Sequence, residues 1–190
     1  MSETGIGVSV KRVEDRRFLT GRGNYTDDIN QPGQLYAWIL RSPHAHACIK
    51  SVDIRRAKEA PGVIAIFTGA DMVADEVGSI PCGWQIHNKD GSPMSEPAHP
   101  PMAFEKVRHV GDQVAIVIAE TKAQARDGSE LITVDYEILK ASIMMNDSLS
   151  ENSAPVHDDV PNNICFDWEI GDKELTDLAF TEAEHIVSIE

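Results

Sequence analysis

The sequence predicts an α+β fold, in which strands and short helices follow one another without a regular strand–helix–strand rhythm. Runs of strand-forming residues occur at 35–40, 45–52, 63–67, 107–110, 114–119 and 132–136. Helix-start patterns at Asp53 and Thr121 lie between them. The 190 residues are 42% hydrophobic and 25% charged, values that are typical of a chain with a packed core.

The first strands follow an irregular beginning. Residues 1–33 are rich in turn-forming glycine, asparagine, aspartate and proline, and they precede any apolar period. Residues 35–40 and 45–52 predict two strands around a Ser42-Pro43 turn. We therefore expect these two strands to be antiparallel neighbours.

A short helix and a long loop are predicted next. Asp53 is expected to cap a helix with Ile54, Ala57 and Ala60 on one face, which ends at Pro61-Gly62. The apolar run 63–67 predicts a fully buried strand. Residues 71–102 are rich in turn-forming residues and predict a long surface loop in which Trp84 is the large apolar anchor.

The next elements have clear local signals. A tight turn at Gly111-Asp112 is expected to join strands 107–110 and 114–119. Thr121 and Gln124 predict a capping box for a helix that runs to about Leu131, which Gly128 weakens by about 1 kcal/mol relative to alanine. The alternation of apolar and polar residues at 132–136 predicts a half-buried strand.

A second, truncated domain is expected after a polar linker. Apolar residues alternate at 166–170, Asp172 can begin a helix with Leu175, Leu178 and Ala179 inward, and 185–190 predicts a strand. The predicted organisation is an irregular lead-in at 1–33, a domain at 34–145, a linker at 146–165 and the start of another domain at 166–190.

Charge and hydropathy disfavour some partners. The 31 acidic and 17 basic residues give a net charge of −14, and lysine and arginine form no concentrated face, so nucleic acid is not expected. No run approaches the roughly 20 apolar residues that cross a bilayer, so membrane insertion is not expected and the cytoplasm is the default compartment. Cys48, Cys82 and Cys165 lack a C-x-x-C spacing and are expected to be reduced thiols.

His44, His46 and Cys48 are the first candidate metal ligands. A strand would project all three onto one face. Structural zinc sites use four ligands, and no second cluster is present. Local hydrogen bonds or a place in an interface are therefore the favoured interpretation, and a small metal-binding protein remains an alternative.

Three other groups invite functional interpretations. Asp15, Asp27, Asp28 and Asn30 could suggest a cation site, but the spacing of a calcium loop is missing and turn formation is favoured. Gly21 and Gly23 precede no strand–helix unit, so they predict no phosphate loop. The remaining group, a possible acid–base trio in the linker, consists of His157, Asp158 and Asp159.

The residues alone indicate no active site. Adjacent carboxylates in a proline-containing linker are usually solvated, and no G-x-S-x-G nucleophile elbow is present. We therefore predict no catalytic, cofactor-binding or metal-binding residue in this chain.

A series of motifs in fixed order resembles the opening of the large subunits of molybdenum hydroxylases, the family of aldehyde oxidase, xanthine dehydrogenase and carbon monoxide dehydrogenase. The first motifs are GRGNYTDDI at 21–29, PGQL at 32–35 and RSPHAHA at 41–47. Later ones match the family's a/b hammerhead domain: IKSVD at 49–53, APGV at 60–63, TGAD at 68–71, VRHVG at 107–111 and VDYE at 134–137. WEIGD at 168–172 and FTEAE at 180–184 are similar to the passage into the first molybdopterin-binding domain, most of all in the carbon monoxide dehydrogenase type.

The chain departs from the family pattern at three places. Cys48 stands where a polar residue is usual, Gly128 replaces a helix-forming alanine, and residues 140–142 replace a proline-containing continuation. The third departure leaves the path out of the preceding strand open.

The resemblance implies a non-catalytic N-terminal accessory domain of an oxidoreductase subunit. In the family the molybdenum–pterin cofactor and the catalytic glutamate belong to later sequence, and iron–sulfur clusters and FAD belong to partner subunits. The expected partners are therefore the remaining molybdopterin-binding domains and those two subunits, and residues 41–47 are expected to be a packing or interface element. A separately encoded assembly or binding module is the alternative.

Overall fold

The computed structural model describes residues 7, 9 and 11–189. It divides into two units, Met1–Leu35 and Tyr36–Glu190. The described part of the first unit contains helix α1 (Asp15–Leu19) and the short 3-10 helix η1 (Thr26–Asp28). Within this unit the ring of Phe18 stacks on the ring of Tyr25, with 5.5 Å between their centroids.

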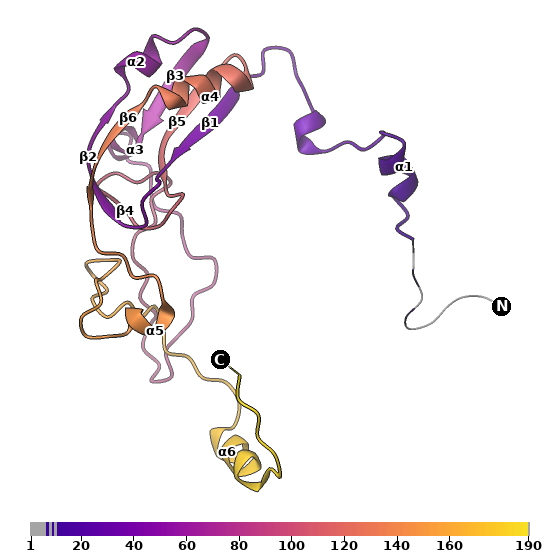
Figure 1. Ribbon diagram of the computed structural model, residues 1–190, viewed down its shortest axis with the longest axis vertical. Helices are drawn as coiled ribbons and strands as arrows, with labels where there is room; N and C mark the ends of the chain where they lie inside the picture. The colour runs from indigo at the N-terminus through magenta and orange to yellow at the C-terminus, as the bar shows by residue number, and fades with distance from the viewer. Residues whose placement is uncertain (1–6, 8, 10, 190) are drawn as a thin grey trace, which may run out of the picture. The chain divides into compact units, whose positions relative to one another are not determined.

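The second unit contains two three-stranded antiparallel sheets (Figure 1). The first sheet has the order β1-β5-β3, formed by β1 (Tyr36–Arg41), β5 (Gln113–Ala119) and β3 (Val63–Thr68). The second has the order β4-β2-β6, formed by β4 (Lys106–Val107), β2 (Ala47–Asp53) and β6 (Thr133–Ile138). Separate sheets with short helices confirm the α+β class.

The expected pairing of the first two strands is wrong. β1 pairs with β5, whereas β2 lies between β4 and β6. The segment around Ser42 is held by hydrogen bonds to the 111–112 turn, and it leads the chain from one sheet into the other. The turn at Gly111, where φ is +89°, is present as expected, but the strands on its two sides also belong to different sheets.

Two helices of this unit have a side chain near their start that accepts a hydrogen bond from a free backbone N–H group, as predicted. Asp53 Oδ1 accepts from the backbone N–H of Arg55, 3.0 Å away, at the start of α2 (Arg55–Lys58). Thr121 Oγ1 accepts from Gln124 N, at 3.2 Å, and starts α4 (Lys122–Glu130), which confirms that helix.

Helix α3 (Gly69–Ala74) was not predicted and occupies the first part of the expected long loop. Thr68 and Asp71 form its capping box, in which Asp71 Oδ2 accepts from Thr68 N at 2.7 Å. These hydrogen bonds hold the pKa of Asp71 below its usual value. Between α3 and β4 the chain forms no further helix and no labelled strand of Figure 1.

The core lies between α4, the first sheet and parts of the second (Figure 1). Val52 of β2 and Val134 of β6 pack against both clusters of buried residues, so the two sheets share one apolar interior. The first cluster consists of Ala57, Ile66, Ala115, Val117 and Ile132, and the second of Ala47, Ala103, Val107 and Val114.

Strand β3 is not fully buried, contrary to the prediction. Ile64 is 57% exposed and Phe67 is 37% exposed, whereas Ile66 is buried. The reason is that β3 is an edge strand and α4 packs on only one face of its sheet. Burial therefore alternates along the strand.

The last part of the chain has less regular structure than expected. Its helices are α5 (Met145–Ser148) and α6 (Lys173–Glu182), the latter capped by Asp172. Residues 166–170 and the described residues 185–189 form no strand, because no strand pairs with them, and Glu190 lies outside the described residues.

Leu175, Leu178 and Ala179 are exposed rather than inward, since the described part of the chain offers α6 no apolar surface to cover them. Trp84 is also exposed and does not anchor its loop. Among the described residues, no helix is long and apolar enough to cross a membrane.

Candidate functional site

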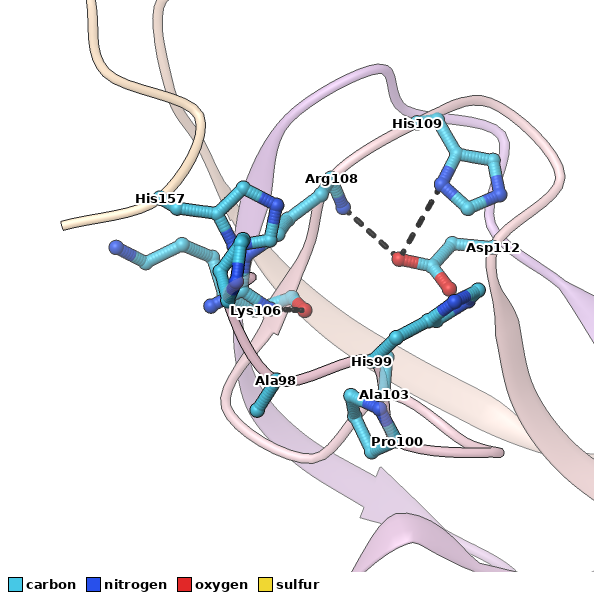
Figure 2. Close-up of a pocket in the computed structure, with 10 residues that line it drawn as sticks. Ala98, His99, Pro100, Ala103, Lys106, Arg108, His109, Asp112 and His157 are labelled. Carbon is cyan, nitrogen blue, oxygen red and sulfur yellow. Dashed lines mark hydrogen bonds and ion pairs between the residues drawn. The ribbon is translucent and has the colours of Figure 1, made fainter. Parts of the chain in front are cut away.

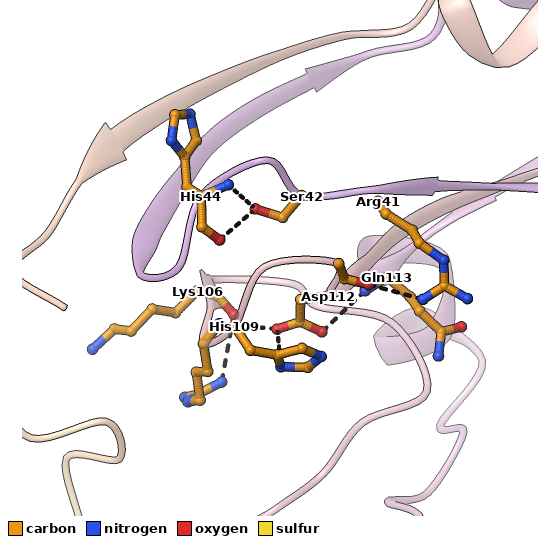
Figure 3. A network of polar contacts seen from close by, with 9 residues as sticks. Arg41, Ser42, His44, Lys106, His109, Asp112 and Gln113 are labelled. Atoms are coloured by element: carbon orange, nitrogen blue, oxygen red, sulfur yellow. Dashed lines mark hydrogen bonds and ion pairs between the residues drawn. The ribbon is translucent and has the colours of Figure 1, made fainter. Parts of the chain in front are cut away.

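The segment 41–47 is tied into the domain by hydrogen bonds (Figure 3). Arg41 Nη1 donates to Gly111 O at 2.8 Å, and the Ser42 backbone N–H donates to Asp112 O at 2.8 Å. Ser42 Oγ accepts from the His44 backbone N–H at 3.0 Å. The packing role expected for this segment is therefore visible, and its interface role stays a prediction.

A hollow of about 310 Å³ opens beside this segment (Figure 2). We call it the Arg108 hollow. Its apolar wall consists of Pro97, Ala98, Pro100 and Ala103. Its polar residues are His99, Lys106, Arg108, His109, Asp112 and His157.

Asp112 organises one side of the Arg108 hollow. Its Oδ2 accepts from the Arg108 backbone N–H at 2.9 Å, and its Oδ1 accepts from the Gln113 backbone N–H at 3.0 Å. The same Oδ2 lies 3.8 Å from His109 Nδ1 (Figure 2). Both carboxylate oxygens are thus used to hold the turn that carries Arg108 and His109.

Lys106 holds the segment around Asp158 against β4. Its Nζ lies 2.8 Å from Asp158 Oδ2 and 3.0 Å from Asp158 Oδ1, and its side chain is only 18% exposed. The hydrogen bonds from Lys106 lower the pKa of Asp158. This ion pair brings the neighbouring His157 to the rim of the hollow.

His157 sits in an environment that disfavours its charged form. Burial is the main cause that lowers its pKa from the ordinary 6.5, and the nearby Arg108 guanidinium acts in the same direction. Asp158 and Asp159 oppose the shift. The imidazole is therefore held neutral to lower pH than a solvated histidine.

A second hollow of about 270 Å³ shares Arg108 and His109 with the first. His46 lines it and is only 6% exposed. Its Nδ1 lies 3.0 Å from Lys140 O, so Nδ1 carries the proton and donates it. Its Nε2 is buried and has no hydrogen-bond partner among the described residues.

The three residues of the H-x-H-x-C spacing do not form one ligand set. The ring of His44 packs edge-on against Tyr136, with 4.9 Å between centroids, while His46 turns to the carbonyl of Lys140. Within the described ranges, no group of three or more His, Cys, Asp or Glu side chains could hold a metal ion. His44 is thus held by a ring contact that was not predicted, and His46 by a hydrogen bond to a distant part of the chain and not by a local one.

The candidates in the first unit serve local structure. Asp28 Oδ2 accepts from the Tyr25 backbone N–H at 2.8 Å and closes the turn of η1, while Asp15 pairs with Arg12. Gly21 follows α1 and donates its N–H to Phe18 O, so it does not begin a helix as a phosphate loop would.

Sequence reasoning singled out His157 and Asp158 but missed the other polar residues of the Arg108 hollow. Those residues come from the long loop, from β4 and from the turn after it, and no spacing links them to His157. The acidic pair of the predicted trio does not act together, because Asp158 faces Lys106. A lone ionisable residue within a turn-rich loop gives no signal by itself.

The family model for the a/b hammerhead domain of aldehyde oxidase and xanthine dehydrogenase matches residues 20–140, which is more than half of the chain. The chain belongs to this family. The resemblance inferred from the motifs is confirmed.

Two curated relatives of this hammerhead chain are the large subunits of a dehydrogenase and of a hydroxylase. The carbon monoxide dehydrogenase large chain of Afipia carboxidovorans is 36% identical over 192 residues, which cover 95% of this chain and 22% of that protein. The nicotine 6-hydroxylase large subunit of Paenarthrobacter nicotinovorans is 36% identical over 184 residues, which cover 96% of this chain and 21% of that protein.

Solved structures of this family have the same fold. A copper- and molybdenum-containing carbon monoxide dehydrogenase matches 95% of this chain and 23% of its own, with a TM-score of 0.70 and 35% identity. Quinoline 2-oxidoreductase from Pseudomonas putida 86 matches 84% of this chain and 19% of its own, with a TM-score of 0.69 and 38% identity. The hammerhead chain thus spans about a fifth of the length of the relatives that it matches.

Proposed function

We propose that this chain is a non-catalytic accessory part of the large subunit of a molybdenum hydroxylase. The observation that carries the proposal is the match of nearly the whole chain to large subunits of which it spans about a fifth. The activity of the intact enzyme is the hydroxylation of a small carbon centre with water as the oxygen source. The compartment is the cytoplasm.

Exposed apolar residues supply the surfaces for assembly. A soluble domain rarely leaves many large apolar side chains together in solvent. In this chain they concentrate after residue 142, at the end of the hammerhead domain, in the linker and around α6: Ile143, Met144, Met145, Leu149, Ile164, Phe166, Trp168, Ile170, Leu175, Leu178, Phe180, Ile186, Val187 and Ile189. These residues pack against the remaining molybdopterin-binding domains, and the iron–sulfur and flavin subunits complete the electron path.

The proposed organisation follows from this assignment. Residues 34–145 form the hammerhead domain, preceded by the lead-in 1–33. Residues 146–165 are the linker, and 166–190 begin the next domain. The exposed apolar residues of α6 support that last division.

The described residues do not fit the molybdenum–pterin cofactor. The hollows that they form, of about 310 and 320 Å³, are at the lower end of the sizes of small-molecule sites and offer little room for a group as large as a molybdenum–pterin cofactor. We therefore assign no catalytic step to this chain. The cofactor, like the base that acts beside it, belongs to other parts of the enzyme.

The coding sequence beyond Glu190 tests this proposal. We expect an open reading frame of several hundred further codons that encodes the molybdopterin-binding domains. A stop codon directly after Glu190 would instead favour a separately encoded module.

A further inference from the structure

Arg108 has an unusual environment for an arginine in an acidic protein. Its guanidinium is half-buried, and its Nε is buried without a hydrogen-bond partner in the described part of the chain. Its Nη1 makes a long hydrogen bond of 3.4 Å to Lys106 O. No described carboxylate lies within ion-pair distance of this guanidinium, although the sequence holds 31 acidic residues.

The acids nearest to Arg108 are already engaged. Asp112 forms no ion pair with the guanidinium, and its two oxygens accept the backbone N–H groups of Arg108 and Gln113. Asp158 is paired with Lys106 through both oxygens. A partly desolvated arginine is normally matched by an anion, because leaving its N–H groups unpaired costs free energy.

Other donors surround the same hollow. His99 comes from the long loop, His109 from the turn after β4, and His157 from the linker (Figure 2). Neutral or protonated, each imidazole can donate one N–H. The hollow of about 310 Å³ is large enough for a small anion and its remaining water.

We propose that the Arg108 hollow binds a small oxyanion, phosphate or carboxylate, through the guanidinium of Arg108 and the surrounding imidazoles. The planar guanidinium presents parallel N–H groups that match two oxygens of such an anion. The Lys106–Asp158 pair holds the linker that carries His157 over the ligand.

The bound anion changes the electrostatics of His157. A negative charge in the hollow offsets the unfavourable effect of Arg108 and favours the imidazolium form, so the pKa of His157 rises. The charged and titratable groups that face or line this region are His46, His99, Lys106, Arg108, His109, Asp112, His157, Asp158 and Asp159.

A titration of the whole 190-residue chain tests the site. Inorganic phosphate, phenyl phosphate and acetate are added separately, and binding is followed by NMR of the histidine rings and by calorimetry. We expect saturable binding at or below about 1 mM for the preferred anion, with shifts at the rings of His99, His109 and His157. Tighter binding of the two phosphates identifies a tetrahedral ligand, whereas tighter binding of acetate identifies a carboxylate.

Variants show whether Arg108 holds the ligand. Arg108→Gln should weaken binding about tenfold or more, as expected for the loss of charge-assisted hydrogen bonds. Arg56→Gln, at an exposed arginine on α2, is the matched control and should change binding less than about twofold. Arg108→Lys keeps the positive charge but lacks the parallel N–H groups of the guanidinium. Its affinity for the anion should lie between those of the other two variants.

The titration of the wild-type chain tests anion binding by the Arg108 hollow even if a variant fails to fold. Absence of saturable binding of all three anions at about ten times the expected concentration contradicts the proposal. So does saturable binding that shifts no histidine ring of the hollow, or an Arg108→Gln variant that folds and binds as tightly as the wild type.

Discussion

Gly128 shows how a residue that weakens a helix can improve the packing of the helix. A Cβ at this position would lie 2.9 Å from Val63 Cγ2 and 3.2 Å from Val117 Cγ1. Glycine therefore lets α4 approach the sheet closely. Glycine is about 1 kcal/mol less favourable than alanine within a helix, and this close packing offsets that cost.

Gly128→Val should destabilise the domain by about 1–3 kcal/mol, because the added methyl groups overpack the interface between α4 and β5. The matched control is Ala123→Val on the exposed side of the same helix, which should cost only a few tenths of a kcal/mol. Denaturant unfolding of both variants measures the difference. If both variants lose the same amount of unfolding free energy, the close approach of α4 to the sheet does not explain the glycine at position 128.

His157 makes stability depend on pH. Its pKa is below the ordinary 6.5 in the folded chain, so between these two values the unfolded chain binds the proton and the folded chain does not. The free energy of unfolding contributed by His157 is therefore present above pH 6.5 and is lost as pH falls toward the folded pKa.

His157→Gln should make the dependence of the unfolding free energy on pH shallower below the ordinary histidine pKa of 6.5. His87→Gln, at an exposed histidine outside the hollow, is the control. Urea unfolding at several pH values gives the slopes. An unchanged slope in the His157 variant would mean that its environment in the folded chain is not the one described.

At the scale of elements, local signals predicted α4 and the strands, and long-range pairing could not be predicted. The cap of Thr121 and the apolar run of β5 are readable within a few residues. The pairing of Tyr36 with Ala119 joins distant parts of the chain, and its free energy depends on packing that no local pattern records. Helix α3 was missed although Thr68 and Asp71 have the spacing of a capping box.

The Arg108 hollow was unpredictable for a similar reason. Its side chains come from three segments, and each segment alone looks like an ordinary surface loop. Only the placement of the linker by the Lys106–Asp158 pair brings His157 to the others. The sequence did contain the motif VRHVG, but the motif does not reveal that Arg108 lacks an acidic partner.

Helix α6 is the element with the clearest test of assembly. Leu178 is exposed on this helix, and the proposed function places it against the next domain. In the intact large subunit, Leu178→Asp should reduce the yield of assembled enzyme several-fold, because a buried unpaired carboxylate costs several kcal/mol.

Thr176→Asp is the matched control on the same helix, because it adds the same carboxylate at an exposed polar position. Size-exclusion chromatography of the purified complexes measures assembly. Normal assembly of the Leu178→Asp variant would mean that α6 does not form part of the proposed interface.

At the scale of the whole molecule, the two clusters of buried residues lie in the hammerhead domain, whereas exposed large apolar residues are denser after residue 142 than before it. A core that closes between two sheets and α4 can fold without further partners, but exposed apolar segments require a covering surface. This contrast supports an accessory domain joined to the beginning of another.

Molybdenum content and turnover of the purified 190-residue chain test the central claim most directly. The chain is produced in cells that make the molybdenum–pterin cofactor, and the intact large subunit with its partners is the positive control. We predict no stoichiometric molybdenum and no oxidation of carbon monoxide, aldehydes or purines by the chain alone. Stoichiometric molybdenum together with turnover of any of these substrates would contradict an accessory, non-catalytic role.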